Sequence, residues 1–247
     1  MLITDKKIVL FTGNYGSGKT EIAVNYSSWL AKQGVKVAIA DIDLVNPYFR
    51  CREARQPLEA LGVRVVAPEG AYFAADLPIL LPELKGLIAK PDGVSVLDVG
   101  GDNVGATVLA SLSDVFDRCQ FEMFFVVNQK RPFTTTVDGV KRIIREIEEA
   151  SKLKITALAG NTHLIDETTA DIVIEGADFT KNVGKETGLP VKFIGVMQYL
   201  MPQVEGKIDG IPLIPMTRLL LPPWLQKSLD KVSTHSKDRF GQLTKKN

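Results

Sequence analysis

A glycine-rich segment near the N-terminus, residues 13–20, reads GNYGSGKT and fits the pattern G-x-x-x-x-G-K-[ST]. An apolar run precedes it and a helix-like segment follows it. Glycines allow such a loop to curl so that backbone N–H groups point at phosphate oxygens, and the helix start adds its positive dipole. We expect the phosphates of a nucleoside triphosphate to be bound by Gly13, Asn14, Tyr15, Gly16, Ser17, Gly18, Lys19 and Thr20.

Two residues of this loop have side chains that could take part in the chemistry. Lys19 would place its charge on the β- and γ-phosphates, which makes it a candidate catalytic group. Thr20 would offer its hydroxyl to a bound Mg²⁺ ion.

Two carboxylates, Asp41 and Asp43, follow the next apolar run at i and i+2, so in an extended chain they point the same way. Beside a bound triphosphate, such a pair could hold magnesium through water or orient an attacking water molecule. We expect Asp41 to contribute to the metal site and Asp43 to be catalytic.

A third carboxylate, Asp98, ends the apolar run of VSVLDVGGDN. An apolar strand that delivers an acid beside a phosphate loop is the Walker B arrangement, in which the acid anchors the magnesium shell. We therefore expect Asp98 to be a metal ligand. Gly100 and Gly101 would allow the backbone to approach the γ-phosphate closely, and we expect an N–H at Gly101 to sense that phosphate.

Short β-rich runs alternate with longer helix-like segments along the chain. The expected strands are Ile8–Thr12, Phe121–Val127, Val191–Met197 and residues 37–40, 63–67, 94–97 and 155–160. The expected helices follow the glycine loop to residue 32 and then occupy residues 49–61, 76–89, 104–118, 135–152 and 167–187, the last interrupted near Gly176. This alternation predicts an α/β protein of three layers, with a mostly parallel, doubly wound sheet between helices. The candidate residues stand at the carboxyl ends of strands, where such sheets bind ligands.

Length and composition favour one domain over residues 1–247, with a core at about residues 6–200 and a C-terminal extension at 201–247. The 30 basic and 29 acidic residues give a net charge of +1, so no nucleic-acid partner is expected. The N-terminus lacks the apolar core of a signal peptide, and the apolar stretch at 211–225 is broken by prolines. We expect a soluble, cytoplasmic protein without a membrane span. That late stretch is either an interaction surface or a segment packed back on the sheet.

Three elements in this order, GNYGSGKT, DIDLVNPYF and LDVGG, resemble the MinD/ParA/nitrogenase-iron-protein (SIMIBI) class of P-loop ATPases, the CobQ/CobB/MinD/ParA nucleotide-binding superfamily. The resemblance covers about residues 6–200 and implies a P-loop NTPase fold. It implies that Asp43 lies in switch I and activates the hydrolytic water, that residues 99–102 form switch II, and that Asn161 binds adenine. Asn14 stands where most members of the class carry a lysine that reaches the partner's nucleotide across a dimer.

The resemblance implies ATP and Mg²⁺ as cofactors and a nucleotide-dependent homodimer or another protein as partner. Without the lysine at position 14, such a dimer would need a different group in trans. The guanine signature NKxD would end a strand, but residues 128–131 read NQKR, so GTP is the less favoured nucleotide. Asn128 itself is typical of a loop turn.

Three functions remain open from these residues. The first is an ATP-hydrolysing molecular switch that regulates or assists a partner in cofactor or metal-centre assembly or in positioning. The second is a small-molecule kinase or ATP-dependent synthetase, with Asp43 as general base and with Arg50 and Arg52 binding acceptor anions. The third is a module that binds ATP without useful turnover.

Cysteine and histidine give weaker signals. Cys51 and Cys119 lack a CxC or CxxC partner, so buried small apolar residues are favoured over metal ligands. His163 follows Asn161 and could lie near the nucleotide, whereas His235 is in the C-terminal tail. Neither has a partner acid at metal-binding spacing, and both are interpreted as incidental.

Overall fold

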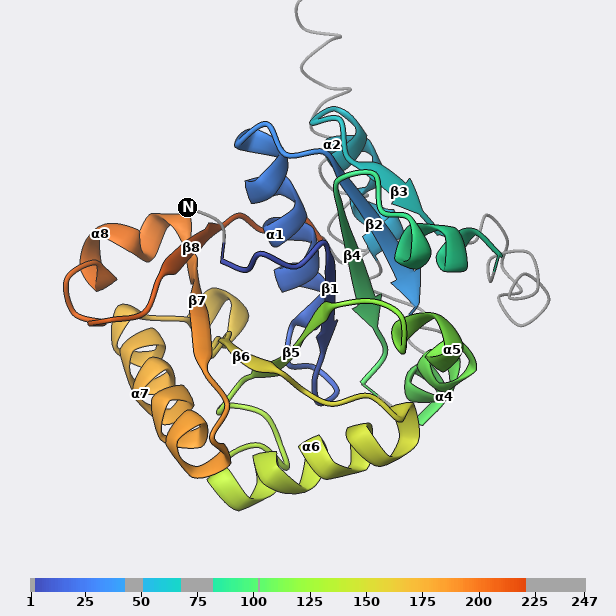
Figure 1. The fold of residues 1–247 in the computed structure, drawn as a ribbon. Coiled ribbons are helices and arrows are strands. Elements are labelled where there is room, and N and C mark those ends of the chain that lie inside the picture. The colour runs from blue at the N-terminus through green and yellow to red at the C-terminus, as the bar shows by residue number, and fades with distance from the viewer. Residues whose placement is uncertain (1–2, 43–50, 68–81, 102, 221–247) are drawn as a thin grey trace, which may run out of the picture.

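The computed structural model describes residues 3–42, 51–67, 82–101 and 103–220. The described strands form a single sheet in the order β3-β2-β4-β1-β5-β6-β7-β8, and every neighbouring pair is parallel (Figure 1). The strands are β1 (Ile8–Thr12), β2 (Val37–Ile42), β3 (Arg64–Val66), β4 (Val94–Val99), β5 (Phe121–Val127), β6 (Ala157–Gly160), β7 (Val191–Met197) and β8 (Leu213–Met216).

Helices cover both faces of the sheet. They are α1 (Lys19–Lys32), the 3₁₀ turn Cys51–Ala54 with α2 (Arg55–Glu59), a helix at residues 82–89, α4 (Asn103–Ser111), α5 (Ser113–Phe116), α6 (Val137–Ser151), α7 (Ala170–Thr187) and α8 (Met201–Val204). Two further 3₁₀ turns occupy Ile165–Glu167 and Gln198–Leu200. None of the helices in the described ranges is both long enough and apolar enough to cross a bilayer.

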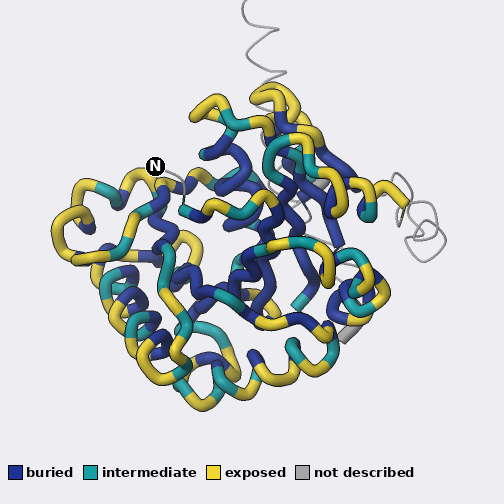
Figure 2. The backbone as a smooth tube through the Cα atoms, in the orientation of Figure 1, coloured by how far each residue is buried: buried dark blue, intermediate teal, exposed yellow. Residues whose placement is uncertain are grey.

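The core has two halves because successive strand residues point to opposite faces. Val9 and Phe11 of β1 pack with α1 and α2, whereas Ile8 and Leu10 pack with the helices on the other face. Figure 2 shows the sheet buried at the centre and the outer faces of the helices exposed. Strands that are buried on both faces read as continuous apolar runs, which is why the sequence predicts them well.

The predicted three-layer α/β fold is confirmed, and each of the seven predicted strands is present. The helices differ in detail. The predicted helix at 104–118 is divided into α4 and α5 around Leu112, and the predicted helix at 49–61 is reduced to a 3₁₀ turn and the short α2. Residues 49–50 of that prediction, and residues 76–81 of the next, lie outside the described ranges.

The predicted interruption of α7 near Gly176 is wrong, because the helix runs unbroken over 18 residues. The glycine has a packing role instead. A Cβ atom at Gly176 would lie 2.1 Å from the Cβ atom of Thr162, so only glycine lets α7 pass this close to the loop after β6.

Strand β8 was not expected, because Pro215 lies within it. Proline is tolerated here because β8 is the last strand of the sheet and pairs only with β7 among the described strands. The chain then runs back over α1, where Asn25 bonds to both the N–H and the C=O of Thr217 at 2.8 and 2.9 Å. For residues 213–220, the interpretation as a segment packed back on the sheet is confirmed.

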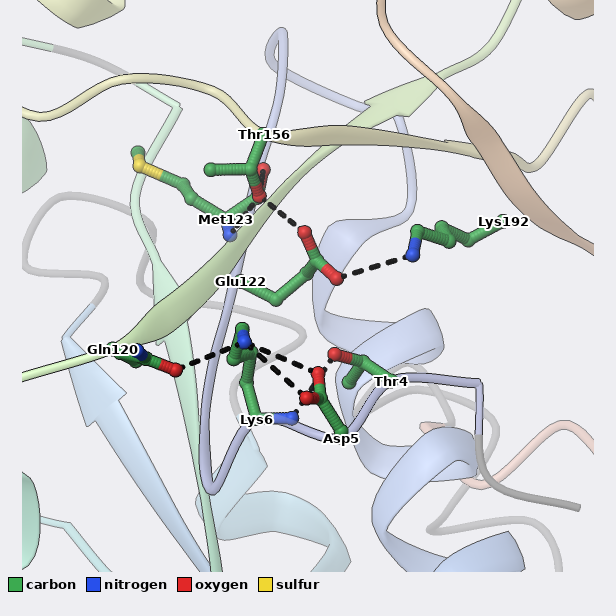
Figure 3. Close-up of polar contacts among 8 residues, drawn as sticks. All are labelled: Thr4, Asp5, Lys6, Gln120, Glu122, Met123, Thr156 and Lys192. Carbon is green, nitrogen blue, oxygen red and sulfur yellow. Dashed lines mark hydrogen bonds and ion pairs between the residues drawn. The ribbon is translucent and has the colours of Figure 1, made fainter.

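Polar contacts also join the opposite, amino-terminal edge of the sheet (Figure 3). The Thr156 hydroxyl donates to Oε1 of Glu122 at 2.6 Å, and Nζ of Lys192 lies 3.5 Å from Oε2 of the same carboxylate. These contacts link the starts of β5, β6 and β7, far along the strands from the glycine loop.

We predict that Asn25→Ala lowers the free energy of unfolding by about 1–3 kcal/mol, because it removes two part-buried hydrogen bonds to the backbone of Thr217. Urea unfolding measures the change. The control is Gln33→Ala, which removes an exposed side-chain bond to Trp29 and should cost under about 0.5 kcal/mol. Equal effects of the two substitutions would contradict this role of Asn25.

Candidate functional site

The glycine loop leaves β1 at Thr12 and enters α1 at Lys19. Gly16 and Gly18 have φ angles of 73° and 82°, which L side chains rarely adopt, so glycine is required at both positions. The N–H of Ser17 donates to the carbonyl of Asn14 at 3.1 Å and closes the turn. No side chain caps the start of α1. A helix start of this kind directs its first N–H groups at a ligand, and anions bind there.

The predicted acids lie on neighbouring strands beside the loop. Asp41 of β2 is in register with Asp98 of β4, and Asp98 is in register with Phe11 of β1. Both carboxyl groups belong to buried residues, and Thr20 is buried in the first turn of α1. A hydroxyl and two carboxylates at this edge are the hard oxygen ligands that Mg²⁺ prefers, so the residues present fit the predicted ion.

Gly101 lies directly against the glycine loop. A Cβ atom at Gly101 would meet the carbonyl oxygen of Gly13 at 2.1 Å. The hydroxyl of Ser17 is buried and has no hydrogen-bond partner among the described residues. The predicted switch glycine and the predicted phosphate loop are therefore in contact, and an unsatisfied donor lies in the loop. Asp43 and Arg50 lie outside the described residues, as does the side chain of Arg52.

Asn14 does not project from the loop as a lysine in trans would. Its Nδ2 donates to the carbonyl of Pro132 at 2.6 Å, and its Oδ1 accepts from the N–H of Tyr15 at 2.9 Å. The adjoining loop after β5 makes a second contact, since Nε of Arg131 donates to the carbonyl of Gly16 at 2.8 Å. Tyr15 is 73% exposed.

A cavity of about 790 Å³ opens beside the glycine loop. Its walls come from the start of α1, the loop after β6, the ends of β7 and β8, and the segment that follows β8. Its volume is within the range of small-molecule sites. Six of the predicted binding residues line this one cavity: Tyr15, Gly16, Gly18, Lys19, Thr20 and Asn161.

Asn161 follows β6, and its side chain is bonded to the glycine loop. Its Nδ2 donates to the carbonyl oxygens of Ser17 at 2.9 Å and Gly18 at 3.4 Å. The amide hydrogens of Asn161 are therefore directed at the loop, and its predicted role in binding the base remains a prediction. Asn128 is the turn residue that was expected, because its Oδ1 accepts from the N–H of Lys130.

His163 was interpreted as incidental, yet it lines the cavity. Its Nδ1 accepts from the N–H of Ile165 at 3.3 Å, while its Nε2 is buried without a partner among the described residues. Burial, followed by the charges of Arg131 and Arg218, lowers the pKa of His163 to about 4. The histidine is therefore neutral near pH 7. The sequence offered one signal for it, the spacing of two residues from Asn161.

The two cysteines were weaker candidates for metal ligands. Cys51 is buried and Cys119 donates to the carbonyl of Ile88, as expected for apolar packing residues. No group of three or more His, Cys, Asp or Glu residues that could hold a metal ion occurs in the described ranges. His235 lies outside them.

Comparisons with known proteins support the fold. No family model matches the chain. It is 24% identical over 191 residues to the signal recognition particle 54 kDa protein of Pyrobaculum calidifontis, an alignment that covers 76% of this chain and 40% of that protein. The chloroplast FtsY structure from Physcomitrella patens matches with a TM-score of 0.53 and 21% identity, over 85% of this chain and 62% of the other.

Two further structures agree. FtsY from Mycoplasma mycoides matches with a TM-score of 0.51 and 18% identity, over 77% of this chain and 60% of the other. FlhF complexed with GTP and Mg²⁺ matches with a TM-score of 0.51 and 17% identity, over 77% of this chain and 66% of the other. The chain has the P-loop NTPase fold of these proteins, as predicted. It spans less than two thirds of the length of the first relatives it matches. The MinD/ParA branch is not among these matches, so membership of that branch remains a prediction.

We predict that Gly101→Ala weakens nucleotide binding at least about tenfold, because the added methyl group collides with the backbone oxygen of Gly13 and displaces the loop. Equilibrium titration with Mg·ATP measures the loss. Gly86→Ala is the matched control, since a Cβ atom there meets no atom within 4 Å. Unchanged affinity in Gly101→Ala would show that Gly101 and the loop do not act together.

Proposed function

We propose that this chain is a magnesium-dependent, ATP-binding molecular switch of the SIMIBI class that hydrolyses its nucleotide and acts on a partner protein. The observation that carries the proposal is the convergence of four predicted elements at one edge of the sheet. The glycine loop begins at β1, Asp98 and Asp41 lie in register on the adjacent strands, and Gly101 contacts the loop.

Each group has a role in this proposal. Loop N–H groups from residues 13–20 and the charge of Lys19 stabilise the phosphates. Thr20, Asp41 and Asp98 hold Mg²⁺, which neutralises charge between the β- and γ-phosphates when bound. Asp43 positions the attacking water. The N–H of Gly101 senses the γ-phosphate, so that its loss on hydrolysis releases the segment after β4.

We propose ATP as the nucleotide, in preference to GTP, because the described residues around the cavity lack a guanine-binding signature. The residues after β6 read Asn-Thr-His-Leu, which has neither the lysine nor the acid of NKxD. The two carboxylates among the cavity residues are engaged, Asp166 with Arg218 at 3.0 Å and Glu21 with the N–H of Leu219 at 2.9 Å. GTP remains the alternative, because FlhF was solved with GTP and Mg²⁺ and one FtsY structure holds GDP.

The partner is proposed to be another protein or a second copy of this chain. Asn14 is bonded to Pro132, so a homodimer would not use position 14 as the group in trans. Assistance in cofactor or metal-centre assembly, or in positioning, is the proposed task. The sequence contains only two cysteines and so no dense disulfide framework, and we propose that the switch works in the reducing cytoplasm.

Phosphate release from Mg·ATP tests the proposal. We predict slow hydrolysis by the unmodified protein, loss of hydrolysis with retained binding in Asp43→Ala, and loss of the magnesium requirement for tight binding in Asp98→Asn. Lys19→Ala should weaken ATP binding by about 100-fold, because a charge-assisted contact to phosphate is lost.

Gly86→Ala serves as the folded control and should behave as the unmodified protein. ATP binding that is indifferent to Lys19→Ala would overturn the assignment of the loop. Transfer of phosphate to a component of a metabolite pool, with no release to water, would replace the switch with a small-molecule kinase. Binding without any turnover would support the non-hydrolysing module instead.

A further inference from the structure

A buried side-chain donor on a residue that lines the cavity has no hydrogen-bond partner among the described residues. Nδ1 of His163 accepts from the N–H of Ile165, so in the neutral ring the proton resides on Nε2. That Nε2 is buried and has no partner in the described part of the chain. Unsatisfied buried donors are rare and costly, so each calls for an explanation such as a bound ligand.

The position of this donor relates it to the nucleotide. A Cβ atom at Gly18 would lie 3.0 Å from Nε2 of His163 and 2.3 Å from Nδ2 of Asn161. The imidazole thus lies against the last glycine of the phosphate loop, where the loop enters α1. An acceptor that reaches Nε2 would belong to the part of a nucleotide that extends from the loop into the cavity.

The neighbouring donors already have hydrogen-bond partners within the protein. The amide hydrogens of Asn161 are directed at the carbonyls of Ser17 and Gly18. Nε of Arg131 bonds to Gly16, and the guanidinium of Arg218 pairs with Asp166. Burial, followed by the charges of Arg131 and Arg218, lowers the pKa of His163 and keeps it uncharged near neutral pH. His163 is therefore a neutral donor whose Nε2 has no partner among the described residues.

We propose that His163 recognises the base of the nucleotide. Its Nε2–H donates a hydrogen bond to N1 of adenine, and this contact selects ATP over GTP. This inference rests on the proposed nucleotide site. Adenine offers a lone pair at N1, whereas guanine carries a hydrogen at N1 and an amino group beside it. A donor directed at N1 of guanine would meet the N1–H group and leave both donors unpaired, and the guanine base would have to shift for its O6 to accept instead. Sites discriminate strongly against a mismatch of this kind.

An analogue series tests the contact at the level of one atom. Binding of ATP, 1-deaza-ATP, 7-deaza-ATP and GTP is measured with Mg²⁺ for the unmodified protein. We predict that 1-deaza-ATP, which has a C–H in place of N1, binds about tenfold more weakly than ATP. The analogue 7-deaza-ATP should bind as ATP does, and GTP should bind more weakly than ATP.

Variants at His163 complete the test. In His163→Phe, ATP and 1-deaza-ATP should bind equally, because the donor is gone. His163→Gln restores a donor and should recover part of the preference for ATP. His163→Asp supplies an acceptor and should shift the preference toward GTP. Tyr199→Phe, at the exposed mouth of the cavity, is the control and should leave the series unchanged.

Thermal unfolding of each variant without nucleotide separates loss of folding from loss of the contact. Tight ATP binding in the unmodified protein with no weakening for 1-deaza-ATP would overturn this inference and leave the proposed switch intact. Equal weakening for ATP and 1-deaza-ATP in His163→Phe, at an unchanged ratio between them, would also overturn it. Absence of binding by every Mg·nucleotide would overturn both.

Discussion

The glycine loop at residues 13–20 is held in place by contacts with other parts of the chain. Asn161 bonds to the carbonyls of Ser17 and Gly18, and Asn14 bonds from the loop to Pro132. Gly101 approaches the carbonyl of Gly13 so closely that no other residue fits. A loop whose carbonyls are bonded outward can keep its N–H groups turned inward. These contacts hold the loop in its curled conformation, and donors held in fixed positions are the condition for strong electrostatic stabilisation.

Helix α1 connects this loop to the other end of the cavity. Its first turn contains Lys19, Thr20 and Glu21. Glu21, together with Asn25 one turn later, holds the segment after β8 through hydrogen bonds to its backbone. Burial raises the pKa of Glu21, since desolvation outweighs the hydrogen bonds that favour its charged form. One helix therefore fixes both the phosphate end of the site and the wall formed by residues 217–220. A shift of the loop would be transmitted to that wall over a short and rigid path.

The sequence predicted those parts of the molecule that follow from local pattern. Strands buried on both faces are continuous apolar runs, so β1, β5 and β7 were predicted with their bounds. The glycine loop was recognisable because φ angles near +80° demand glycine at fixed spacing. Features set by tertiary contact were missed. Gly176 lies inside α7 to make room for Thr162, and Pro215 lies in β8 because that strand is at an edge.

The role of His163 in the site also depends on tertiary contacts that a sequence pattern does not predict. From sequence it had no partner, because its role depends on distances to Gly18 and Ile165 that only the folded chain sets. Asn161 lies against the glycine loop, and its bonds to that loop could not be predicted from its residue type. The predicted acids Asp41 and Asp98 were located because the carboxyl ends of neighbouring parallel strands always meet at one edge.

Backbone hydrogen exchange with and without Mg·ATP tests most directly whether the loop at residues 13–20 cradles phosphate. We predict slower exchange at the amides of residues 16–20 and 100–101 when Mg·ATP is bound, because phosphate oxygens accept from those groups. Amides at the opposite edge of the sheet, near Glu122 and Thr156, should be unchanged. Saturating nucleotide that leaves residues 16–20 unprotected would contradict the assignment of this loop as the phosphate site.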